Sequence, residues 1–326
     1  MCLGSVLILI GKTRSGEHAL QLALDVAGDV GLPWIEVRAH LELSHSYMER
    51  GKHKLARAHL AQADALLAIE PDNDLELRAA EAGAFLAHEE GRNEDARARW
   101  LAALELAAGN RAAEARCLLG LASQQLRTGD TEGAAPALNQ ALGAARAAGD
   151  RLLQGRVLNN IGLLHSALGE HEKALENFRQ AITVREGIPY GRGLLVNHHN
   201  IGDAHFNRSE WSRAWVAFSA SRKIAEDMGW ERGMALNDTY MGYIETLRNR
   251  RSEGRLRMRK AIEIARRVSD PEIETFGLWL LARSHADDHD EEMARALLEQ
   301  AATAAEGIQM VQMMDSIESM RARLRR

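Results

Sequence analysis

Helix-ending positions recur along the chain at an almost constant spacing. The separations between them are 40, 38, 40, 40, 40 and 40 residues, and each position divides two segments with a helical pattern. They are Gly51, Gly91, Gly129, Gly169, Ser209, Asn249 and His289. A period of this length is typical of a repeat architecture, in which each unit packs only on its neighbours.

Small residues follow these positions at two fixed distances. Five residues on stand Ala56, Ala96, Ala134, Ala174, Ala214, Gly254 and Ala294, and seven further on stand Ala63, Ala103, Ala141, Ala181, Ser221, Ala261 and Ala301. A larger apolar residue lies between them, namely Leu60, Trp100, Leu138, Phe178, Phe218, Met258 or Leu298. Small side chains on one helical face let a second helix approach closely. The pattern therefore predicts seven pairs of packed helices.

Three short segments with a central glycine predict helix boundaries. Residues 27–29, 108–110 and 148–150 read AGD, AGN and AGD. Glycine can adopt the left-handed conformation that closes a helix, and Asp or Asn can cap the helix that follows. We therefore expect one helix to stop and another to start at each segment.

Composition supports helices and narrows the function. Proline is scarce, aromatic residues make up 5% of the chain, and alanine and leucine dominate, which favours helices over sheets. The formal net charge of -5 argues against a protein that coats nucleic acid.

Neither the cysteines nor the N-terminal apolar run indicates export or membrane insertion. Cys2 and Cys117 cannot by themselves form a disulfide framework or a metal site, which fits a reducing compartment. Residues 6–10 are apolar but too short to span a bilayer, and they lack the basic segment and cleavage site of a signal peptide. We expect a cytoplasmic protein with no membrane partner.

Two units carry a recognisable motif. Residues 157–182 read VLNNIGLLHSALGEHEKALENFRQAI, and residues 198–221 repeat the pattern as HHNIGDAHFNRSEWSRAWVAFSAS. Both resemble the tetratricopeptide repeat, and the resemblance extends in phase over residues 32–307. It implies an all-α, right-handed α-solenoid of antiparallel helix pairs. The long period resembles the repeat regions of kinesin light chains, LGN-type polarity adaptors and maltose-activator-like signalling proteins.

The repeat register predicts three parts. Residues 1–31 form an N-terminal half repeat or cap, in which residues 11–28 are a second helix. Residues 32–307 form seven repeats, and residues 308–326 form a C-terminal capping helix. The incomplete first unit indicates either a piece of a longer protein or a short apolar cap, and both interpretations stay open.

The sequence offers little for catalysis. Gly11-Lys12-Thr13 suggests a phosphate-binding loop, but Gly4 and Gly11 have six residues between them where that loop needs four. His285 and His289 fall on a turn, and the remaining histidines are scattered, so converging metal ligands are not expected. We expect no cofactor, no metal and no enzymatic activity.

An arginine row is the most informative set of polar residues. We expect the second residue of the first helix to be arginine in each of the first four units, namely Arg38, Arg78, Arg116 and Arg156. In the family that the chain resembles, first helices line the concave surface, which makes the row a stripe of guanidinium groups suited to carboxylates. The row either recognises an acidic peptide or protein segment, or pairs with Glu and Asp of neighbouring repeats.

Asparagines and aromatic residues extend the candidate surface. In the adaptors that the chain resembles, asparagines at the place of Asn160 and Asn200 bind the backbone of an extended peptide, and Asn159 is a further candidate. Most aromatic residues between 206 and 243 are expected to pack between repeats. We expect His199, Asp203, Tyr240 and Tyr243 to be exposed in the groove.

The stretch of residues 248–260 and the tail add basic residues. They could meet an acidic partner or nucleic acid, but such runs are more often solvated helix faces, and we expect no nucleic-acid binding.

These observations favour a non-catalytic scaffold that binds a protein or peptide, in bacterial signalling or regulation. The alternative is a detached C-terminal sensor arm of a larger signalling kinase or nucleotide-switched ATPase. An in-frame catalytic domain encoded upstream would favour the alternative.

Overall fold

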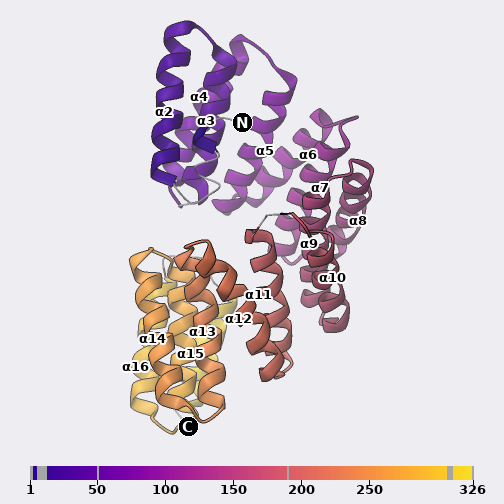
Figure 1. The fold of residues 1–326 in the computed structure, drawn as a ribbon. Helices are drawn as coiled ribbons and strands as arrows, with labels where there is room; N and C mark the ends of the chain where they lie inside the picture. The colour runs from indigo at the N-terminus through magenta and orange to yellow at the C-terminus, as the bar shows by residue number, and fades with distance from the viewer. Residues whose placement is uncertain (1–2, 6–12, 50, 189–190, 307–310, 325–326) are drawn as a thin grey trace. The chain divides into compact units, whose positions relative to one another are not determined.

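The computed structural model describes the chain except residues 1–2, 6–12, 50, 189–190, 307–310 and 325–326. Every regular element of the described residues is a helix (Figure 1). The helices divide into two compact units, residues 1–188 and 189–326, and each unit is described by itself. The predicted all-α solenoid of antiparallel helix pairs is confirmed.

From residue 13 onward, the described residues of the first unit form a single helix followed by four helix pairs. The single helix is α2 (Thr13–Val30). The pairs are α3 (Pro33–Glu49) with α4 (His53–Ile69), α5 (Asn73–Glu89) with α6 (Asn93–Leu106), α7 (Arg111–Arg127) with α8 (Thr131–Ala147), and α9 (Arg151–Ala167) with α10 (His171–Thr183).

The described residues of the second unit, 191–306 and 311–324, form three helix pairs and a further helix. The pairs are α11 (Gly191–Asn207) with α12 (Trp211–Asp227), α13 (Glu231–Leu247) with α14 (Arg251–Arg267), and α15 (Pro271–Ala286) with α16 (Glu291–Ala305). The further helix, α17 (Val311–Arg323), begins 40 residues after α15 and therefore takes the register of an eighth first helix.

The turn within each pair depends on a residue in the left-handed conformation. Its φ lies between 59° and 81° at all seven predicted positions: Gly51, Gly91, Gly129, Gly169, Ser209, Asn249 and His289. Glycine adopts this conformation at no steric cost, whereas a side chain makes it unfavourable. The predicted turn positions are confirmed in every repeat.

The predicted small residues are the contact points between paired helices. The alanines at both positions of every second helix are at most 1% exposed, and Ser221 and Gly254 are buried too. The large residue between them packs on the first helix: a Cβ added to Gly162 would lie 2.4 Å from the Phe178 ring. Close approach rests on a glycine facing a large residue in the pairs that contain Gly162 with Phe178, Gly202 with Phe218 and Gly242 with Met258.

One predicted helix boundary is wrong. Residues 27–29 lie inside α2, and the turn comes at Gly31, whose φ is 71°. The proline at position 33 explains the shift, because a ring-fixed φ suits the first residue of a helix. The boundaries at 108–110 and 148–150 are confirmed, with Asn110 and Asp150 accepting capping hydrogen bonds from Ala113 and Leu153.

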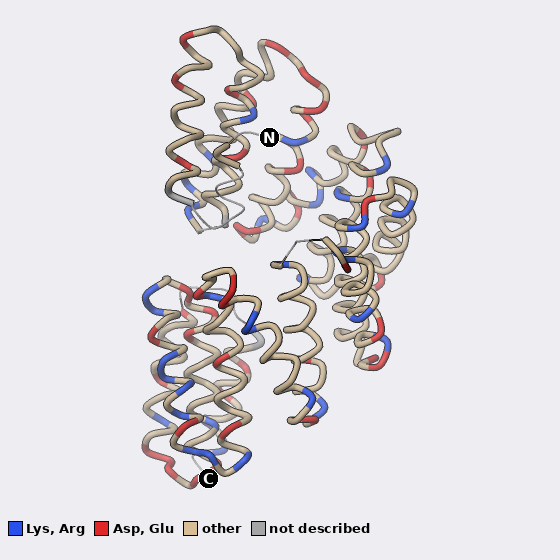
Figure 2. Tube along the Cα trace, viewed as in Figure 1, with Lys and Arg blue, Asp and Glu red and all other residues tan. Residues whose placement is uncertain are grey.

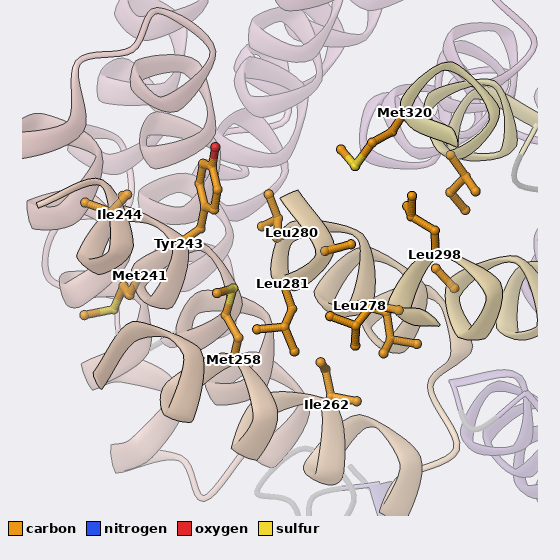
Figure 3. Close-up of a cluster of buried hydrophobic side chains, with 14 of the residues drawn as sticks. Met241, Tyr243, Ile244, Met258, Ile262, Leu278, Leu280, Leu281, Leu298 and Met320 are labelled. Atoms are coloured by element: carbon orange, nitrogen blue, oxygen red, sulfur yellow. The ribbon is translucent and has the colours of Figure 1, made fainter. Parts of the chain in front are cut away.

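The core of the second unit extends into α17. Met320 joins the buried cluster that contains Leu280 and Leu298 (Figure 3), and Ile317 of the same helix is fully buried. The apolar N-terminal run at residues 6–10, and Gly11 and Lys12 of the suggested phosphate loop, lie outside the described residues.

Candidate functional site

The arginine row lies on the first helices, but at a different register from the one predicted. Arg38, Arg78, Arg116 and Arg156 are each the sixth residue of their helix, not the second. The reason is that the helices start earlier, at Pro33 and behind the caps Asp72, Asn110 and Asp150. The register is identical in all four repeats, so the row itself is preserved.

Two arginines of the row are neutralised by carboxylates. Arg116 forms an ion pair with Glu81 of the preceding first helix, with an N–O distance of 3.0 Å. Arg78 pairs with Asp74 one turn earlier in its own helix, at 3.2 Å. These two guanidinium groups therefore have structural partners.

The other two arginines form no ion pair with any described carboxylate. Arg156 is an exposed residue of α9. Arg38 is half-buried, and its Nε donor is shielded from solvent without an acceptor. Charge available to a ligand therefore concentrates at the two ends of the row.

Arg38 also borders a cavity of about 240 Å³ between α2 and α3. Leu20, Trp34 and Ile35 give it an apolar lining, to which the Glu42 side chain adds a carboxylate. Trp34 is 53% exposed although it is a large aromatic residue. An apolar cavity beside an unneutralised guanidinium group suits a ligand that carries an apolar group next to a carboxylate.

The predicted asparagines are engaged within the repeat stack. Asn160 donates to the Arg156 carbonyl at 3.0 Å, and its Oδ1 lies 3.2 Å from the Ser123 hydroxyl of the preceding first helix. Asn159 is 8% exposed. Asn200 is half-buried and has interactions of its own. Their use by a peptide stays a prediction.

In the second unit, His199, Asp203 and Tyr240 form part of a packed polar network. Tyr240 donates to Asp203 at 3.1 Å, and His199 Nδ1 lies 3.1 Å from Asn237 Oδ1. The Tyr240 ring stacks on Phe218, with a centroid distance of 4.5 Å. Burial lowers the pKa of His199, and burial together with the Asp203 carboxylate raises the pKa of Tyr240. These contacts describe packing between repeats.

The expected groove exposure of Tyr243 is wrong. Its side chain is 1% exposed, and its hydroxyl donates to Asp287 at 3.2 Å. The ring packs beside Phe206 and under the Arg283 guanidinium. The sequence predicted an exposed side chain at this position, but the neighbouring helices cover it.

Much of the basic stretch is paired with acids. Arg257 contacts Asp238 and Glu245 at 2.7 and 3.0 Å, and Arg251 and Arg255 each contact Asp288 at 3.2 Å. Figure 2 shows acidic and basic positions interspersed along both units. The stretch is therefore largely a network of ion pairs on a helix face.

Metal and thiol chemistry find little support. No group of three or more His, Cys, Asp or Glu side chains within the described part of the chain is placed to hold a metal ion. Cys117 is buried, and burial together with the Glu81 carboxylate raises the pKa of its thiol to about 12. Such a thiol is a poor nucleophile.

The described helices include none that is long and apolar enough to cross a membrane.

The cavity beside Arg38 was not predicted, although Arg38 itself was. The signal available in the sequence was Trp34, a tryptophan next to the proline that starts α3. Its exposure depends on how α2 packs against α3, which repeat register alone does not determine.

Comparison with known proteins supports the repeat assignment. A family model described as tetratricopeptide repeat matches residues 136–187. None of the curated proteins compared matches the chain.

Solved structures with the same fold are distant in sequence. Aspartyl phosphate phosphatase F from Bacillus subtilis is 15% identical, with a TM-score of 0.68 over 90% of this chain and 76% of that one. NprR in complex with its cognate peptide NprX is 13% identical, with a TM-score of 0.62 over 97% and 91% of the two chains.

A third similar structure belongs to a larger protein. It is a signal transduction ATPase with a tetratricopeptide repeat sensor from Pyrococcus horikoshii, 15% identical, with a TM-score of 0.61. The match covers 93% of this chain and 49% of that one.

Proposed function

Because this chain is a tetratricopeptide-repeat protein, we propose that it is a non-catalytic scaffold that binds a protein or peptide. In this proposal, the first-helix face of residues 13–188 recognises an acidic segment that also carries an apolar side chain. The supporting observation is that Arg38 and Arg156 carry unneutralised charge on that face, with the Trp34 cavity beside Arg38. Arg78 and Arg116 are held by carboxylates and contribute less.

The chemistry of the face favours an extended acidic ligand over a compact one. The sixth residue of each first helix recurs once per repeat, so contacts at α3 and α9 need a segment that follows several repeats. A repeat solenoid offers such a preformed surface without ordering cost. The structurally similar NprR was solved with a peptide, which is consistent with this mode of binding.

The test compares two matched double variants in peptide binding. Arg38→Ala with Arg156→Ala removes the two available charges from the first helices. Arg97→Ala with Arg179→Ala removes the same charge from exposed positions on second helices. Binding of an acidic peptide library that includes Leu and Phe is measured by fluorescence anisotropy at 50 and 300 mM salt.

We expect the first double variant to lose about tenfold or more in affinity at low salt, since each charge-assisted contact contributes about 1.5 kcal/mol. The control variant should stay within about twofold, as expected for screened remote charges. Equal losses in both variants would show that only net charge matters. Unchanged binding in the first variant would exclude this face as the binding surface.

A second candidate is that the chain is the sensor arm of a larger signalling protein. It is supported by the fold similarity to the repeat sensor of the Pyrococcus horikoshii ATPase. Isolating the native polypeptide from its own cells with an antibody, then measuring its mass and ATP hydrolysis, tests this candidate. A mass near 36.0 kDa without ATPase activity would reject it.

The cellular setting belongs to the same proposal. We place the scaffold in the cytoplasm, in bacterial signalling or regulation, and we assign it no hydrolytic step. The division into a half repeat (1–31), seven repeats (32–307) and a capping helix (308–326) is likewise proposed, and limited proteolysis with mass spectrometry tests these boundaries.

A further inference from the structure

A second cavity lies in the other unit, between two consecutive first-type helices. It occupies about 420 Å³ between α15 and α17, and Trp279, Arg283, Ser319 and Arg323 contribute to its walls. Because α17 starts 40 residues after α15, Arg323 repeats the position of Arg283 and Ser319 that of Trp279. Both arginines are the thirteenth residue of their helix, so they belong to corresponding faces.

The two guanidinium groups carry unneutralised charge. Among the described residues, neither Arg283 nor Arg323 forms an ion pair, and Asp315 is the only carboxylate that lines the cavity. The nearby Arg321 shows the contrast, because it pairs with Glu299 and Glu318. Two guanidinium groups beside the single carboxylate of Asp315 give the cavity a net positive lining.

Aromatic contacts fix the orientation of Arg283. Its guanidinium carbon lies 5.1 Å from the Tyr243 ring centroid and 5.8 Å from that of Trp279. Tyr243 is in turn held by its hydrogen bond to Asp287. Contacts with ring faces orient a guanidinium group while leaving its N–H donors for another partner. Arg283 also contacts the Tyr243 hydroxyl, which leaves the rest of its N–H donors for a further acceptor.

The walls of the cavity offer further donors. The Trp279 indole N–H is shielded from solvent and has no acceptor. Ser319 adds a hydroxyl from α17. Because the indole N–H is covered, the donors that a ligand in the cavity can reach are the two guanidinium groups and the Ser319 hydroxyl. Donors dominate among the polar groups, so an anionic ligand fits better than a cationic one.

We propose that the cavity between α15 and α17 binds a carboxylate of an acidic peptide, clamped between Arg283 and Arg323. This inference rests on the proposed peptide-binding function and adds a second site, in residues 189–326, to the Arg38 face. A volume of about 420 Å³ lies within the range of small-ligand pockets and holds a side chain together with adjoining backbone. Bidentate guanidinium contacts select the planar carboxylate group.

The experiment uses the full chain and isothermal titration calorimetry with three probes. The first is an amidated peptide with three internal glutamates, the second is an alanine peptide with a free C-terminal carboxylate, and the third is inorganic phosphate. The variants are Arg283→Gln with Arg323→Gln, and Arg323→Gln alone, which changes an exposed side chain and leaves the aromatic contacts intact. The control is Arg259→Gln with Lys260→Gln, the same charge loss on exposed positions of α14.

We expect one of the two peptide probes to bind the native chain and the other to bind more weakly, which distinguishes a side-chain carboxylate from a terminal one. The double variant should weaken that binding at least tenfold, Arg323→Gln about threefold or more, and the control less than twofold. Equal binding by the double variant overturns the inference, and so does an equal loss in the control. Binding of phosphate without either peptide overturns the peptide assignment.

The same titrations distinguish failure of the α15–α17 site from failure of the proposed peptide-binding function at the Arg38 face. Arg38→Ala with Arg156→Ala is titrated in parallel. If only that variant loses peptide affinity, the Arg38 face is supported and the α15–α17 site is rejected. If only Arg283→Gln with Arg323→Gln loses affinity, the second site stands and the Arg38 face fails. If no probe binds the native chain, both are rejected.

Discussion

The Nδ1 atom of His205 lies 2.7 Å from a carboxylate oxygen of Glu210, across the turn that joins α11 to α12. The backbone N–H of Glu210 also donates to the His205 carbonyl, at 2.9 Å. The same pairing recurs 40 residues earlier in His165 with Glu170, and 80 residues later in His285 with Asp290. Backbone and side chain together close these turns, which keeps the two helices of a pair antiparallel.

The turn closed by His205 and Glu210 contains Ser209 in a left-handed conformation, with φ at 59°. A residue with a Cβ loses about 1–2 kcal/mol there, whereas glycine loses none. Glycine also makes the unfolded chain more flexible, which lowers the free energy of unfolding by about 0.5–1 kcal/mol. We therefore predict that Ser209→Gly raises the free energy of unfolding by about 0.5–1 kcal/mol in urea titrations.

Ser252 supplies the matched control, because it is exposed in the helical conformation of α14. Ser252→Gly should lower the free energy of unfolding by a few tenths of a kcal/mol, since glycine has a lower helix propensity than serine even in the first turn of α14. If the two serine-to-glycine substitutions change the free energy of unfolding in opposite directions, the backbone conformation at each position is the cause. Destabilisation by both would contradict the left-handed assignment at Ser209.

Two half-buried histidines should make the first unit sensitive to acid. Burial and the neighbouring His59 lower the pKa of His40 to about 4, and burial with the Arg127 charge lowers the pKa of His88 to about 4. In the unfolded chain both histidines have a pKa near 6.5. Between pH 6.5 and 4 the unfolded state therefore binds protons that the folded state does not bind. Stability is therefore fully present above about pH 6.5 and falls as the pH drops toward 4.

The measurement is the midpoint of urea unfolding at pH 7.5 and pH 5.0. His88→Gln removes the titrating ring but keeps an acceptor for Arg127, whose guanidinium nitrogen lies 3.0 Å from His88 Nδ1. We expect this variant to lose less stability on acidification than the native chain. His18→Gln, which changes an exposed histidine of α2, is the matched control. A pH profile of His88→Gln identical to the native one would remove His88 as a cause.

The contact between Gly162 and Phe178 tests the packing of a helix pair. A Cβ at position 162 would lie 2.4 Å from the Phe178 ring, well inside van der Waals contact. We predict that Gly162→Ala lowers the free energy of unfolding by about 1–3 kcal/mol through overpacking. Adding Phe178→Leu should restore part of this loss, because the smaller side chain vacates the space.

Gly143 is the control for this packing effect. It lies exposed in α8, and a Cβ there would meet no atom within 4 Å. Gly143→Ala should therefore stabilise the protein by about 0.5–1 kcal/mol, as expected from helix propensity alone. If Gly162→Ala is equally stabilising, the close approach of Phe178 is not a constraint.

Periodicity predicted the parts of the fold that repeat, and missed the parts that do not. The turn at Gly169 and the contact of Ala174 depend on residues close in sequence, so they follow from register. Whether Arg116 is neutralised depends on Glu81, 35 residues away, and on the distance between two first helices. The burial of Tyr243 and the cavity beside Arg283 likewise depend on how successive helices are spaced. The repeat register determines the helix face on which a residue lies, but the packing of neighbouring helices decides whether its side chain is available to a ligand.

Arg116 and Arg156 occupy the same register position, yet we predict opposite consequences for their loss. Arg116 pairs with Glu81, whose side chain is 19% exposed, so Arg116→Ala leaves a half-buried carboxylate without its main partner. We expect the free energy of unfolding to fall by about 1 kcal/mol, and peptide affinity to change little. Arg156→Ala changes an exposed, unpaired side chain, so stability should stay within about 0.5 kcal/mol while affinity for acidic peptides falls several-fold at low salt and less at high salt.

Glu81→Gln completes the comparison as a double-mutant cycle. If Arg116 acts through Glu81, the stability losses of Arg116→Ala and Glu81→Gln should not add in the double variant, because each removes the same ion pair. The measurements are urea unfolding for stability and anisotropy titrations at 50 and 300 mM salt for affinity. Additive losses of stability would mean that Arg116 and Glu81 act independently. A loss of affinity in Arg116→Ala as large as that in Arg156→Ala would mean that a ligand competes with Glu81 for the guanidinium group. An acidic ligand would then have to displace Glu81 from Arg116, and Arg116 would contribute to binding together with Arg156.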